Sequence, residues 1–394
     1  MSLALQGFSV EVLGAWSDPI LKARDEAILG SLPYKFTSVV DVTSGKLPQL
    51  RRRIRSRVGR IFRQLSNTEN RLQLGYFYPE LRRAAFRRKA DLYIAHSEQA
   101  MAVAVDLLRD RRRVGVDMED WFSEDLLPHA RRYRPVSLLR HLEKELLVRG
   151  GYASCPSTSL SAALANAYGI KSPAIIYNAF PWTDRLLLDR VQKDRQHSRV
   201  PSIHWYSQTI GPGRGLEDLL AALPLLKHDA EIHLRGQPTA DLENWLGARV
   251  PHTWRNRIFL HGLVTNTELL SRIAEHDIGF AGELTYCRNR DLTVTNKILH
   301  YLLGGLAVVA SNTTGQCEVA RQAPDAVFLY APGDNYSLAS AFNVLLGSTE
   351  TLDRAKASAL RAADQTFCWE RQEKVLLETV AHAIDEPVGY DWTQ

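Results

Sequence analysis

Short apolar runs that contain β-branched and aromatic residues recur along the whole chain, and most are separated by helical or polar stretches. In the N-terminal half, these runs occupy residues 8–13, 36–42, 91–95, 114–118, 152–157 and 174–178. In the C-terminal half, they occupy residues 202–207, 231–236, 257–262, 277–282, 306–311 and 326–330. Strands that alternate with helices favour parallel sheets, so the pattern predicts an α/β protein with a parallel sheet in each half.

The length of the chain fits this division. At 394 residues, it should form about two domains of roughly 100–200 residues each. Residues 183–200 are charged and carry no strand pattern, which indicates a connector. We therefore predict an N-terminal domain over residues 1–182, a linker over 183–200, a C-terminal domain over 201–366 and a last helical segment over 367–394.

The sequence shows neither the pattern of a membrane span nor that of a secretory signal. It has no run of about 18 uninterrupted apolar residues, and its first residues lack a charged region followed by a cleavage site. Cys155, Cys287, Cys317 and Cys368 are scattered, without the paired spacing of a zinc site or a disulfide framework. These features predict a reducing, cytoplasmic location.

Residues 293–311, TVTNKILHYLLGGLAVVAS, predict a helix, a glycine turn and then a short apolar strand. Thr295 is placed to cap this helix, because a threonine hydroxyl can accept a hydrogen bond from a free N–H of the first turn. Asn296 and Lys297 follow it, and a helix N-terminus carries roughly +0.5 charge. Together they predict a binding site for a phosphate or diphosphate, and the alternative is an ordinary capped helix.

A second anion-binding candidate lies upstream, in residues 205–223. Gly211, Gly213 and Gly215 separate a strand-like run from an amphipathic helix, and Arg214 stands between the last two. Glycines let the backbone approach a ligand closely, but their spacing here differs from the dinucleotide fingerprint. Taken by itself, this loop could be a turn without a bound phosphate. Two strand–loop–helix junctions in one parallel sheet, however, indicate a diphosphate held between them.

Longer motifs surround these two junctions. The C-terminal half contains GPGRGLEDLL, RIFLHGLVTNTELL, HDIGFAGE and NRDLTVTNKILHYLLGGLAVVAS, and the N-terminal half contains ADLYIAHS, VGVDMEDWFSED and YGIKSPAIIYNAFP. Through these motifs the chain resembles retaining GT-B glycosyltransferases, in the large nucleotide-sugar-dependent family that includes sucrose and mannosyl transferases (glycosyltransferase family 4-like). The resemblance implies two Rossmann-like domains that face each other across a cleft, with a C-terminal helix that crosses back to the first domain.

The resemblance also implies an activity, the retaining transfer of a sugar from a nucleoside-diphosphate sugar to a hydroxyl acceptor. The donor that it implies is a UDP-sugar. In the family, the loop's basic residue and the later helix grip the diphosphate, and these roles fall on Arg214 and Lys297. Preorganised positive charge stabilises the leaving diphosphate, so neither a metal nor another cofactor is expected. The implied donor site comprises Gly211, Gly213, Arg214, Glu283, Arg290, Asp291, Thr295, Asn296, Lys297 and His300. For the loop from Glu283 to Asp291, mutual salt bridges are the alternative.

The acceptor side is expected in the N-terminal half. His96 follows one predicted strand, and Asp117, Glu119 and Asp120 lie at the end of the next. We expect Glu119 to bind the acceptor or to help as a base, with the other three side chains beside it. The alternative for His96 is a structural histidine. The alternative for the acidic cluster is a metal site, which it resembles only loosely.

Several positions depart from the family's pattern. The two glutamates usually found eight positions apart at the donor site align with Leu292 and His300, and a second basic residue aligns with Gln208. The histidine expected after the fourth strand of the first domain aligns with Glu119. That domain's usual first strand and its glycine-bearing loop are not recognised ahead of residues 8–13, so we expect either that the chain lacks this strand or that another segment replaces it. A neutral His300 would accept one ribose hydrogen bond and titrate near pH 6.5. These departures favour one rival function, a catalytically dead assembly or regulatory subunit. A second rival is a nucleotide-sugar epimerase on the same fold, which would need acid–base carboxylates facing the sugar.

The net charge of +5 is unevenly distributed. Residues 49–65 hold seven arginines with apolar residues at helical spacing, and further basic clusters occupy residues 82–89 and 131–134. The first segment predicts a basic amphipathic helix that attaches to an anionic membrane surface or captures a lipid-phosphate acceptor. A solvated helix packed on its domain is the alternative, and no nucleic acid is expected because no reading motif accompanies the charge. A role in bacterial surface polysaccharide or glycolipid synthesis is what the resemblance implies.

Overall fold

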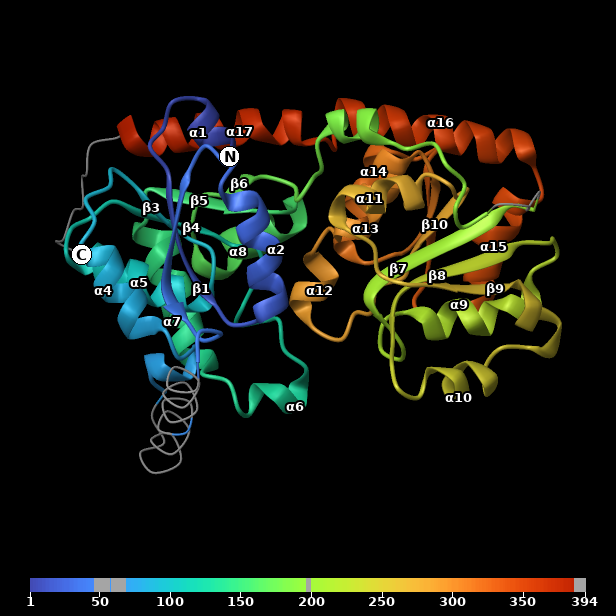
Figure 1. Cartoon of the computed structure of the whole chain (residues 1–394), viewed down its shortest axis with the longest axis horizontal. Coiled ribbons are helices and arrows are strands. Elements are labelled where there is room, and N and C mark those ends of the chain that lie inside the picture. The colour runs from blue at the N-terminus through green and yellow to red at the C-terminus, as the bar shows by residue number, and fades with distance from the viewer. Residues whose placement is uncertain (46–56, 58–68, 196–199, 386–394) are drawn as a thin grey trace. The chain divides into compact units, whose positions relative to one another are not determined.

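The computed structural model describes residues 1–45, 57, 69–195 and 200–385. These residues divide into two compact units (Figure 1). The first unit comprises Met1–Cys155, Ser161–Ala174 and Val375–Gln394, and the second comprises Pro156–Leu160 and Ile175–Lys374. The predicted basic helix over residues 49–65 lies outside the described residues, apart from Arg57, so it stays a prediction.

The first unit contains a four-stranded sheet in the order β3-β4-β5-β6, in which β4 pairs in parallel with β3 and with β5. Its strands are β3 (Tyr93–Ala95), β4 (Val114–Asp117), β5 (Tyr152–Cys155) and β6 (Ala174–Ile175). Two earlier strands, β1 (Glu11–Trp16) and β2 (Lys35–Asp41), form a separate parallel pair. Every strand predicted in the N-terminal half is confirmed, but among the described residues the first two pair only with each other.

Helices of the first unit are held to one another by polar contacts as well as by apolar packing. Helix α5 (Glu98–Arg109) is buried along most of its length, as its run of small and apolar residues requires. The buried Asp106 carboxylate on α5 accepts hydrogen bonds from Tyr78 at 2.6 Å and Arg82 at 2.8 Å, which fix α4 (Tyr78–Phe86) against it. The remaining helices are α1 (Ser2–Leu5), α2 (Pro19–Leu29), η1 (Arg71–Gln73), α6 (Pro128–Arg131), α7 (Val136–Arg149), α8 (Thr158–Tyr168) and α17 (Trp369–Asp385), of which the last two begin in the second unit.

The second unit holds a six-stranded parallel sheet in the order β12-β11-β10-β7-β8-β9. Its strands are β7 (Ser202–Ile210), β8 (Glu231–Pro238), β9 (Ile258–His261), β10 (Ile278–Ala281), β11 (Ala307–Ser311) and β12 (Val327–Tyr330). Each strand predicted in the C-terminal half is confirmed. Successive side chains of a strand point to opposite faces, and on β11 Val308 and Val309 accordingly pack into two different cores.

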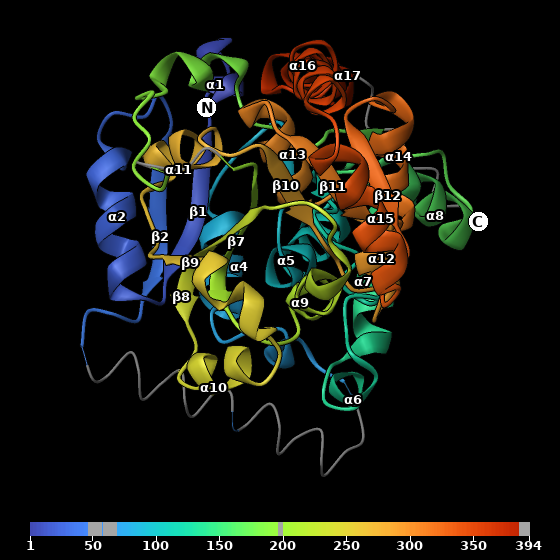
Figure 2. The same ribbon diagram turned by 90° about the vertical axis from the view of Figure 1, so that its right-hand side faces the viewer.

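Helices cover both faces of this sheet. They are α9 (Leu216–Ala222), α10 (Leu242–Gly247), α11 (Asn266–Ile273), α12 (Arg288–Leu292), α13 (Asn296–Gly304), α14 (Thr314–Gln322), α15 (Asn335–Leu346) and α16 (Thr349–Gln365), with the 3-10 helices η2 (Trp182–Leu187), η3 (Leu223–Leu225) and η4 (His252–Arg257). Helices α11 and α13 lie on one side, and α9 and α15 on the other (Figure 2). Coverage of both faces explains why β11 is buried and apolar almost throughout. Across the described part of the chain, no helix is both long and apolar enough to span a membrane.

Helix α13 ends as the sequence predicts but begins differently. Gly305 follows it with φ 79°, the left-handed conformation that glycine favours, and its N–H donates to Leu302 and Tyr301. Thr295 has the extended backbone of an N-cap, yet its hydroxyl makes no bond to the first turn. Within the part of the chain that the structure describes, that hydroxyl oxygen is buried without a hydrogen-bond partner, so the predicted side-chain cap is wrong. The backbone alone sets the start of this helix.

The charged segment that precedes β7, described as far as residue 195, forms ion pairs within the second unit. Arg195 Nη1 lies 2.8 Å from Asp277 Oδ2. The guanidinium of Arg272, buried in α11, donates to Asp189 Oδ1 at 2.6 Å. Charges that suggest a solvated connector in the sequence are therefore matched by opposite charges on α11 and beside β10.

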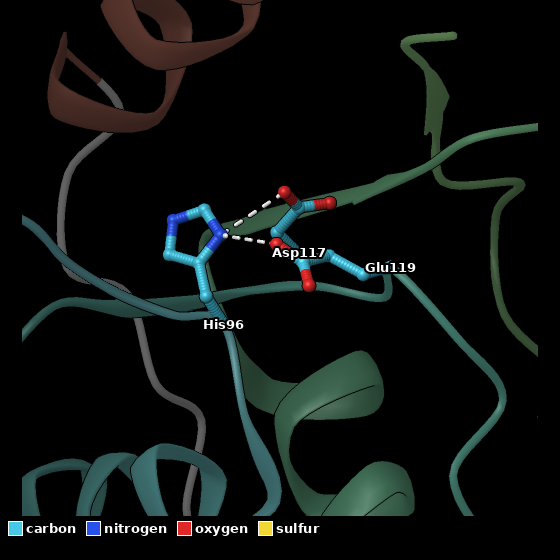
Figure 3. A group of neighbouring side chains, drawn as sticks. All are labelled: His96, Asp117 and Glu119. Carbon is cyan, nitrogen blue, oxygen red and sulfur yellow. Dashed lines mark ion pairs between the residues drawn. The ribbon is translucent and has the colours of Figure 1, made fainter. Parts of the chain in front are cut away.

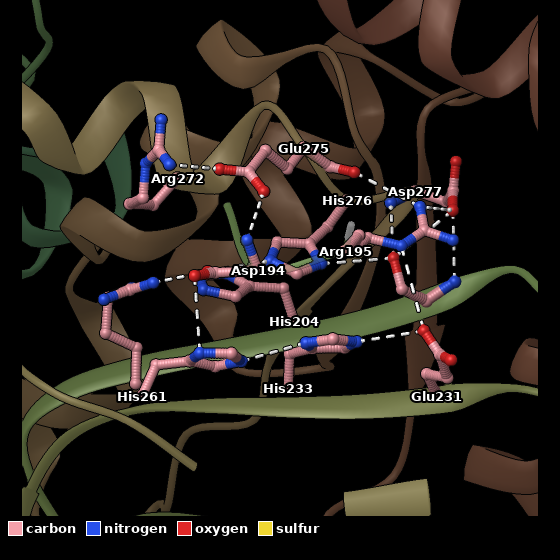
Figure 4. Close-up of polar contacts among 12 residues, drawn as sticks. Asp194, Arg195, His204, Glu231, His233, His261, Arg272, Glu275, His276 and Asp277 are labelled. Atoms are coloured by element: carbon pink, nitrogen blue, oxygen red, sulfur yellow. Dashed lines mark hydrogen bonds and ion pairs between the residues drawn. The ribbon is translucent and has the colours of Figure 1, made fainter. Parts of the chain in front are cut away.

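A cluster of histidines, here called the histidine layer, lies in the second unit on strands or beside them (Figure 4). Its members are His204 on β7, His233 on β8, His261 on β9 and His276 just before β10. The rings of His204 and His276 stack with centroids 4.5 Å apart, and His233 Nδ1 lies 3.0 Å from His261 Nε2. Asp194 approaches the layer with Oδ1 at 3.3 Å from His261 Nδ1, while its other oxygen accepts a hydrogen bond from Arg235.

Candidate functional site

The glycine loop of the second unit follows β7 and leads into α9. The backbone N–H of Gly213 donates to Glu217 Oε1 at 2.6 Å, and the Arg214 side chain is exposed. Gly215 adopts φ 78°, and a Cβ at this position would meet the carbonyl oxygen of Gly282 at 2.4 Å. A glycine is required there on both counts. The loop that carries Arg214 thus lies directly against the segment that follows β10.

That neighbouring segment carries Glu283, which pairs with the predicted phosphate ligand. Lys297 Nζ, in the first turn of α13, lies 2.6 Å from Glu283 Oε1, and both side chains are less than one-fifth exposed. The N–H of Glu283 donates to Ser311 Oγ at 2.8 Å, which fixes its backbone beside β11. The structure therefore brings two predicted donor residues together, and Asn296 lies exposed beside Lys297 at the helix start. Their pairing was not part of the sequence-based expectation.

Two further predicted donor residues, Arg290 and Asp291, lie on α12, and a third, Gly211, lies in the loop after β7. Asp291 accepts from the backbone N–H of Thr314 at 3.1 Å and from its hydroxyl at 2.7 Å, so it supports the start of α14. Arg290 lies on the same short helix and is half-buried. A Cβ added at Gly211 would lie 2.9 Å from Thr239 Oγ1, so the glycine allows the backbone to pack closely against Thr239. In this structure Asp291 thus has a structural partner, and its contact with a donor sugar stays a prediction.

His300 occupies a buried position on α13. Its Nδ1 lies 2.9 Å from the Tyr206 hydroxyl, and its ring stacks on Phe180 with centroids 3.5 Å apart. The side chain is 8% exposed, and burial lowers its pKa to about 4. The expected titration near pH 6.5 is therefore wrong, because the ring is desolvated and no carboxylate from the described part of the chain contacts it. The ribose contact stays a prediction, and Tyr206 and Phe180 are partners that the sequence pattern did not indicate.

The predicted acceptor residues come together in the first unit (Figure 3). Because β3 and β4 are adjacent parallel strands, their carboxyl ends meet at one edge of the sheet. His96 Nδ1 there lies 3.1 Å from Asp117 Oδ2 and 3.6 Å from Glu119 Oε1. Burial alone would lower the pKa of His96, but hydrogen bonds and charge from both carboxylates outweigh it and raise this pKa to about 9. His96 is therefore an imidazolium near pH 7, and Asp120 follows Glu119 in the same loop.

A second set of polar residues, missed by sequence reasoning, supports this cluster from behind. Asp117 Oδ1 accepts from Ser154 Oγ at 2.9 Å, and Ser154 Oγ accepts from the Tyr152 hydroxyl at 2.9 Å. The loop after β4 is anchored where Ser123 donates from its N–H and its hydroxyl to the buried Glu143 at 2.8 and 2.7 Å. The only sequence signal for these partners is a polar residue inside an apolar run, and that signal does not identify which residue it contacts.

The comparisons with known proteins concern the second unit most directly. Residues 202–348 match the family model described as "Glycosyl transferases group 1". This match includes the Arg214 loop, Glu283 and the start of α13, and it excludes the first unit. No curated protein sequence matches the chain.

Solved structures match nearly the whole chain in fold. Sucrose-phosphate synthase from Thermosynechococcus elongatus has a TM-score of 0.68 at 13% identity, covering 96% of this chain and 90% of that one. HepE from Anabaena in complex with UDP has a TM-score of 0.65 at 17% identity, covering 94% and 91%. A UDP-forming trehalose-phosphate synthase from Burkholderia xenovorans has a TM-score of 0.65 at 10% identity, covering 96% and 100%. Together with the two parallel α/β units, these likenesses confirm the GT-B fold predicted from the sequence.

Proposed function

We propose that this protein is a glycosyltransferase that moves a sugar from a nucleoside-diphosphate sugar to a hydroxyl acceptor. The observation that carries the proposal is a continuous chain of contacts in the second unit. Gly215, next to Arg214, lies against Gly282, and the adjacent Glu283 holds Lys297 at the start of α13. This arrangement places a basic loop and a basic helix N-terminus around one segment, within the region that matches the glycosyltransferase family model.

In this proposal the second unit binds the donor. Negative charge develops on the diphosphate as it leaves, and cationic side chains with helix N–H groups stabilise such charge when they are fixed in advance. Arg214 and Lys297 supply the cations. Glu283 orients Lys297 before the donor binds and then accepts a hydrogen bond from a sugar hydroxyl. UDP is the favoured nucleotide, since HepE has been solved with UDP-glucose as well as with UDP.

The first unit acts on the acceptor in this proposal. Glu119 accepts the hydrogen bond of the acceptor hydroxyl and assists its deprotonation. His96, which stays charged near pH 7, can only donate hydrogen bonds and so orients the two carboxylates. The same proposal includes retention at the anomeric carbon and stabilisation of the leaving diphosphate without a metal or another cofactor. It also includes a role at the membrane periphery in bacterial surface polysaccharide or glycolipid synthesis. These features rest on the resemblance and on the basic segment 49–65.

A second candidate, a catalytically inactive glycosyltransferase-like subunit, is favoured by specific observations. Leu292 and His300 stand where the family usually has glutamates, and both are buried. The His300 ring already makes a hydrogen bond with the Tyr206 hydroxyl and stacks on Phe180. A site without these carboxylates has fewer acceptors for ribose and sugar hydroxyls.

Calorimetric titration with UDP, GDP and ADP separates the two candidates. We expect UDP to bind, and Arg214→Ala and Lys297→Ala each to weaken it by about 10- to 100-fold, because a charge-assisted hydrogen bond contributes roughly 1.5–3 kcal/mol. Arg354→Ala, which removes an exposed arginine on α16, is the matched control and should bind like the parent. Absence of binding to all three nucleotides by a folded protein would favour the inactive subunit. Equal affinity in parent and both variants would refute the donor site.

A further inference from the structure

The ends of β3 and β4 bring together one imidazole and two carboxylates. The nearest ligand-type atoms of His96, Asp117 and Glu119 all lie within 4.8 Å of one another. Bonds of about 2.0–2.2 Å from zinc to nitrogen and oxygen place neighbouring ligand atoms about 3–4 Å apart. The observed separations of 3.1 and 3.6 Å from His96 Nδ1 fall in this interval. Among the described residues, no other three His, Cys, Asp or Glu side chains gather so closely.

The outer contacts of the cluster are those that a metal site needs. Ligand side chains are commonly oriented by hydrogen bonds from a second layer of residues. Here the buried Ser154 holds Asp117 Oδ1 and leaves Oδ2 directed to His96, and the buried Tyr152 in turn holds Ser154. These two residues lie on β5, so the position of Asp117 is set by a strand and not by a loop. The Asp117 carboxylate is therefore prepared to receive a cation at one defined oxygen.

Exposure and donor type decide what kind of ion would bind. His96 and Glu119 have side chains that are about half exposed, 56% and 52%, so an ion can enter from solvent. Magnesium and calcium prefer sites made only of oxygen, and manganese also favours carboxylates, whereas imidazole nitrogen suits zinc, copper, iron and nickel ions. Three protein ligands leave at least one coordination position open for water or for an oxygen of a bound molecule.

We propose that His96, Asp117 and Glu119 form a binding site for a divalent transition-metal ion, with Zn²⁺ bound more tightly than Mn²⁺ and both more tightly than Mg²⁺. The open position would take a hydroxyl or phosphate oxygen of the acceptor, which is the one part of this inference that rests on the proposed function. Binding of the ion itself does not depend on the donor site, because all three ligands belong to the first unit. Binding of the ion requires His96 to release its proton, so it competes with the ion pair between protonated His96 and the two carboxylates.

The test is a calorimetric titration of the full chain, freed of metal with a chelator and then dialysed, with ZnCl₂, MnCl₂ and MgCl₂. We expect one Zn²⁺ per chain. His96→Ala and Asp117→Asn should each weaken binding by at least about 10- to 100-fold, since loss of an outer-shell partner alone costs that much in known sites. Ser154→Ala should weaken it less than either ligand variant. Visible absorption of added Co²⁺ should report the same site and disappear in His96→Ala.

A surface histidine provides the matched control. His141 lies exposed on α7 in the same unit, and His141→Ala should leave Zn²⁺ affinity unchanged. No binding of Zn²⁺ or Mn²⁺ up to millimolar concentration would overturn the proposal, as would equal binding by parent and His96→Ala. UDP titrations in the presence of the chelator keep the two proposals apart. Normal UDP binding with no metal binding would refute only the metal site, and the reverse result would refute only the donor site.

Discussion

Histidine occurs in two contrasting surroundings in this protein. His96 in the first unit is half exposed beside two carboxylates, and its pKa is raised to about 9. In the histidine layer of the second unit, burial is the largest cause that lowers the pKa of His233 to about 2 and that of His276 to about 4. Neighbouring cations lower both values further, and Asp194 opposes the shift without reversing it. The same side chain is thus held charged in one unit and neutral in the other.

The difference lies in how the nearby acids are shared. Around His96, two carboxylates serve one imidazole. In the histidine layer, Asp194 lies near His261 and His276 but also accepts a hydrogen bond from Arg235. A carboxylate already neutralised by a guanidinium stabilises little further positive charge, so desolvation decides the outcome. The ratio of acids to cations, rather than the presence of histidine, therefore determines the charge of each region.

The largest expected effect is loss of stability in mild acid through the histidine layer. A histidine with a folded pKa near 4 and an unfolded pKa near 6.5 takes up its proton only in the unfolded chain between these values. Its contribution is therefore fully present above pH 6.5 and lost as the pH falls towards 4. For His276 this amounts to on the order of 3 kcal/mol over the whole interval, of which about 2 kcal/mol is lost by pH 5. Urea unfolding at pH 7.5, 6 and 5, followed by tryptophan fluorescence, measures it. A midpoint that stays constant across this range would contradict the neutral state of the layer.

A somewhat smaller effect concerns His96. Replacing one of its two carboxylates by Asp117→Asn should lower the pKa of His96 by about 1–3 units, because a nearby opposite charge shifts a pKa by that amount. NMR titration of the imidazole in chelator-treated protein gives the value. The matched control is Asp110→Asn, an exposed carboxylate of the same unit that pairs with Arg112. An unchanged pKa in Asp117→Asn would mean that the carboxylates do not hold the charge.

A third effect tests whether the layer is stabilised by its polar atoms at all. Both ring nitrogens of His204 are buried without a hydrogen-bond partner among the described residues, and burial lowers the pKa of this residue. Replacing an unsatisfied buried polar group by an apolar one of similar size should be neutral or stabilising, so we expect His204→Leu to raise the free energy of unfolding by about 1 kcal/mol. Chemical denaturation at pH 7.5 measures the change. Strong destabilisation would show that His204 has a polar role in the native protein.

The smallest effect concerns His300, which resembles the layer in being buried and neutral. Because burial lowers its pKa to about 4, His300→Gln should change UDP affinity by the same factor at every pH between 5.5 and 7.5. The ratio of parent to variant affinity, measured by calorimetry, removes the titration of the nucleotide itself. A ratio that changes around pH 6.5 would place His300 in solvent instead of against Phe180.

The sequence predicted the elements of this fold well. Short apolar runs located every described strand in both halves of the chain, and Gly304-Gly305 located the end of α13. Such features depend on local geometry: side-chain alternation along a strand and the left-handed conformation of a glycine are properties of a few consecutive residues. Candidate site residues at strand ends were located for the same reason, since adjacent parallel strands end at one edge.

Only the tertiary structure decided the state of those residues. It paired Lys297 with Glu283, stacked His300 on Phe180, and directed Asp117 to His96 through Ser154. Each of these contacts joins residues from different elements, and their geometry depends on how helices and strands pack. Sequence spacing identified which chemical groups gather at the ends of the sheets. Packing sets the burial of each group and the charge nearest to it. These two quantities determined whether the group is ionised and whether another side chain of the protein already contacts it.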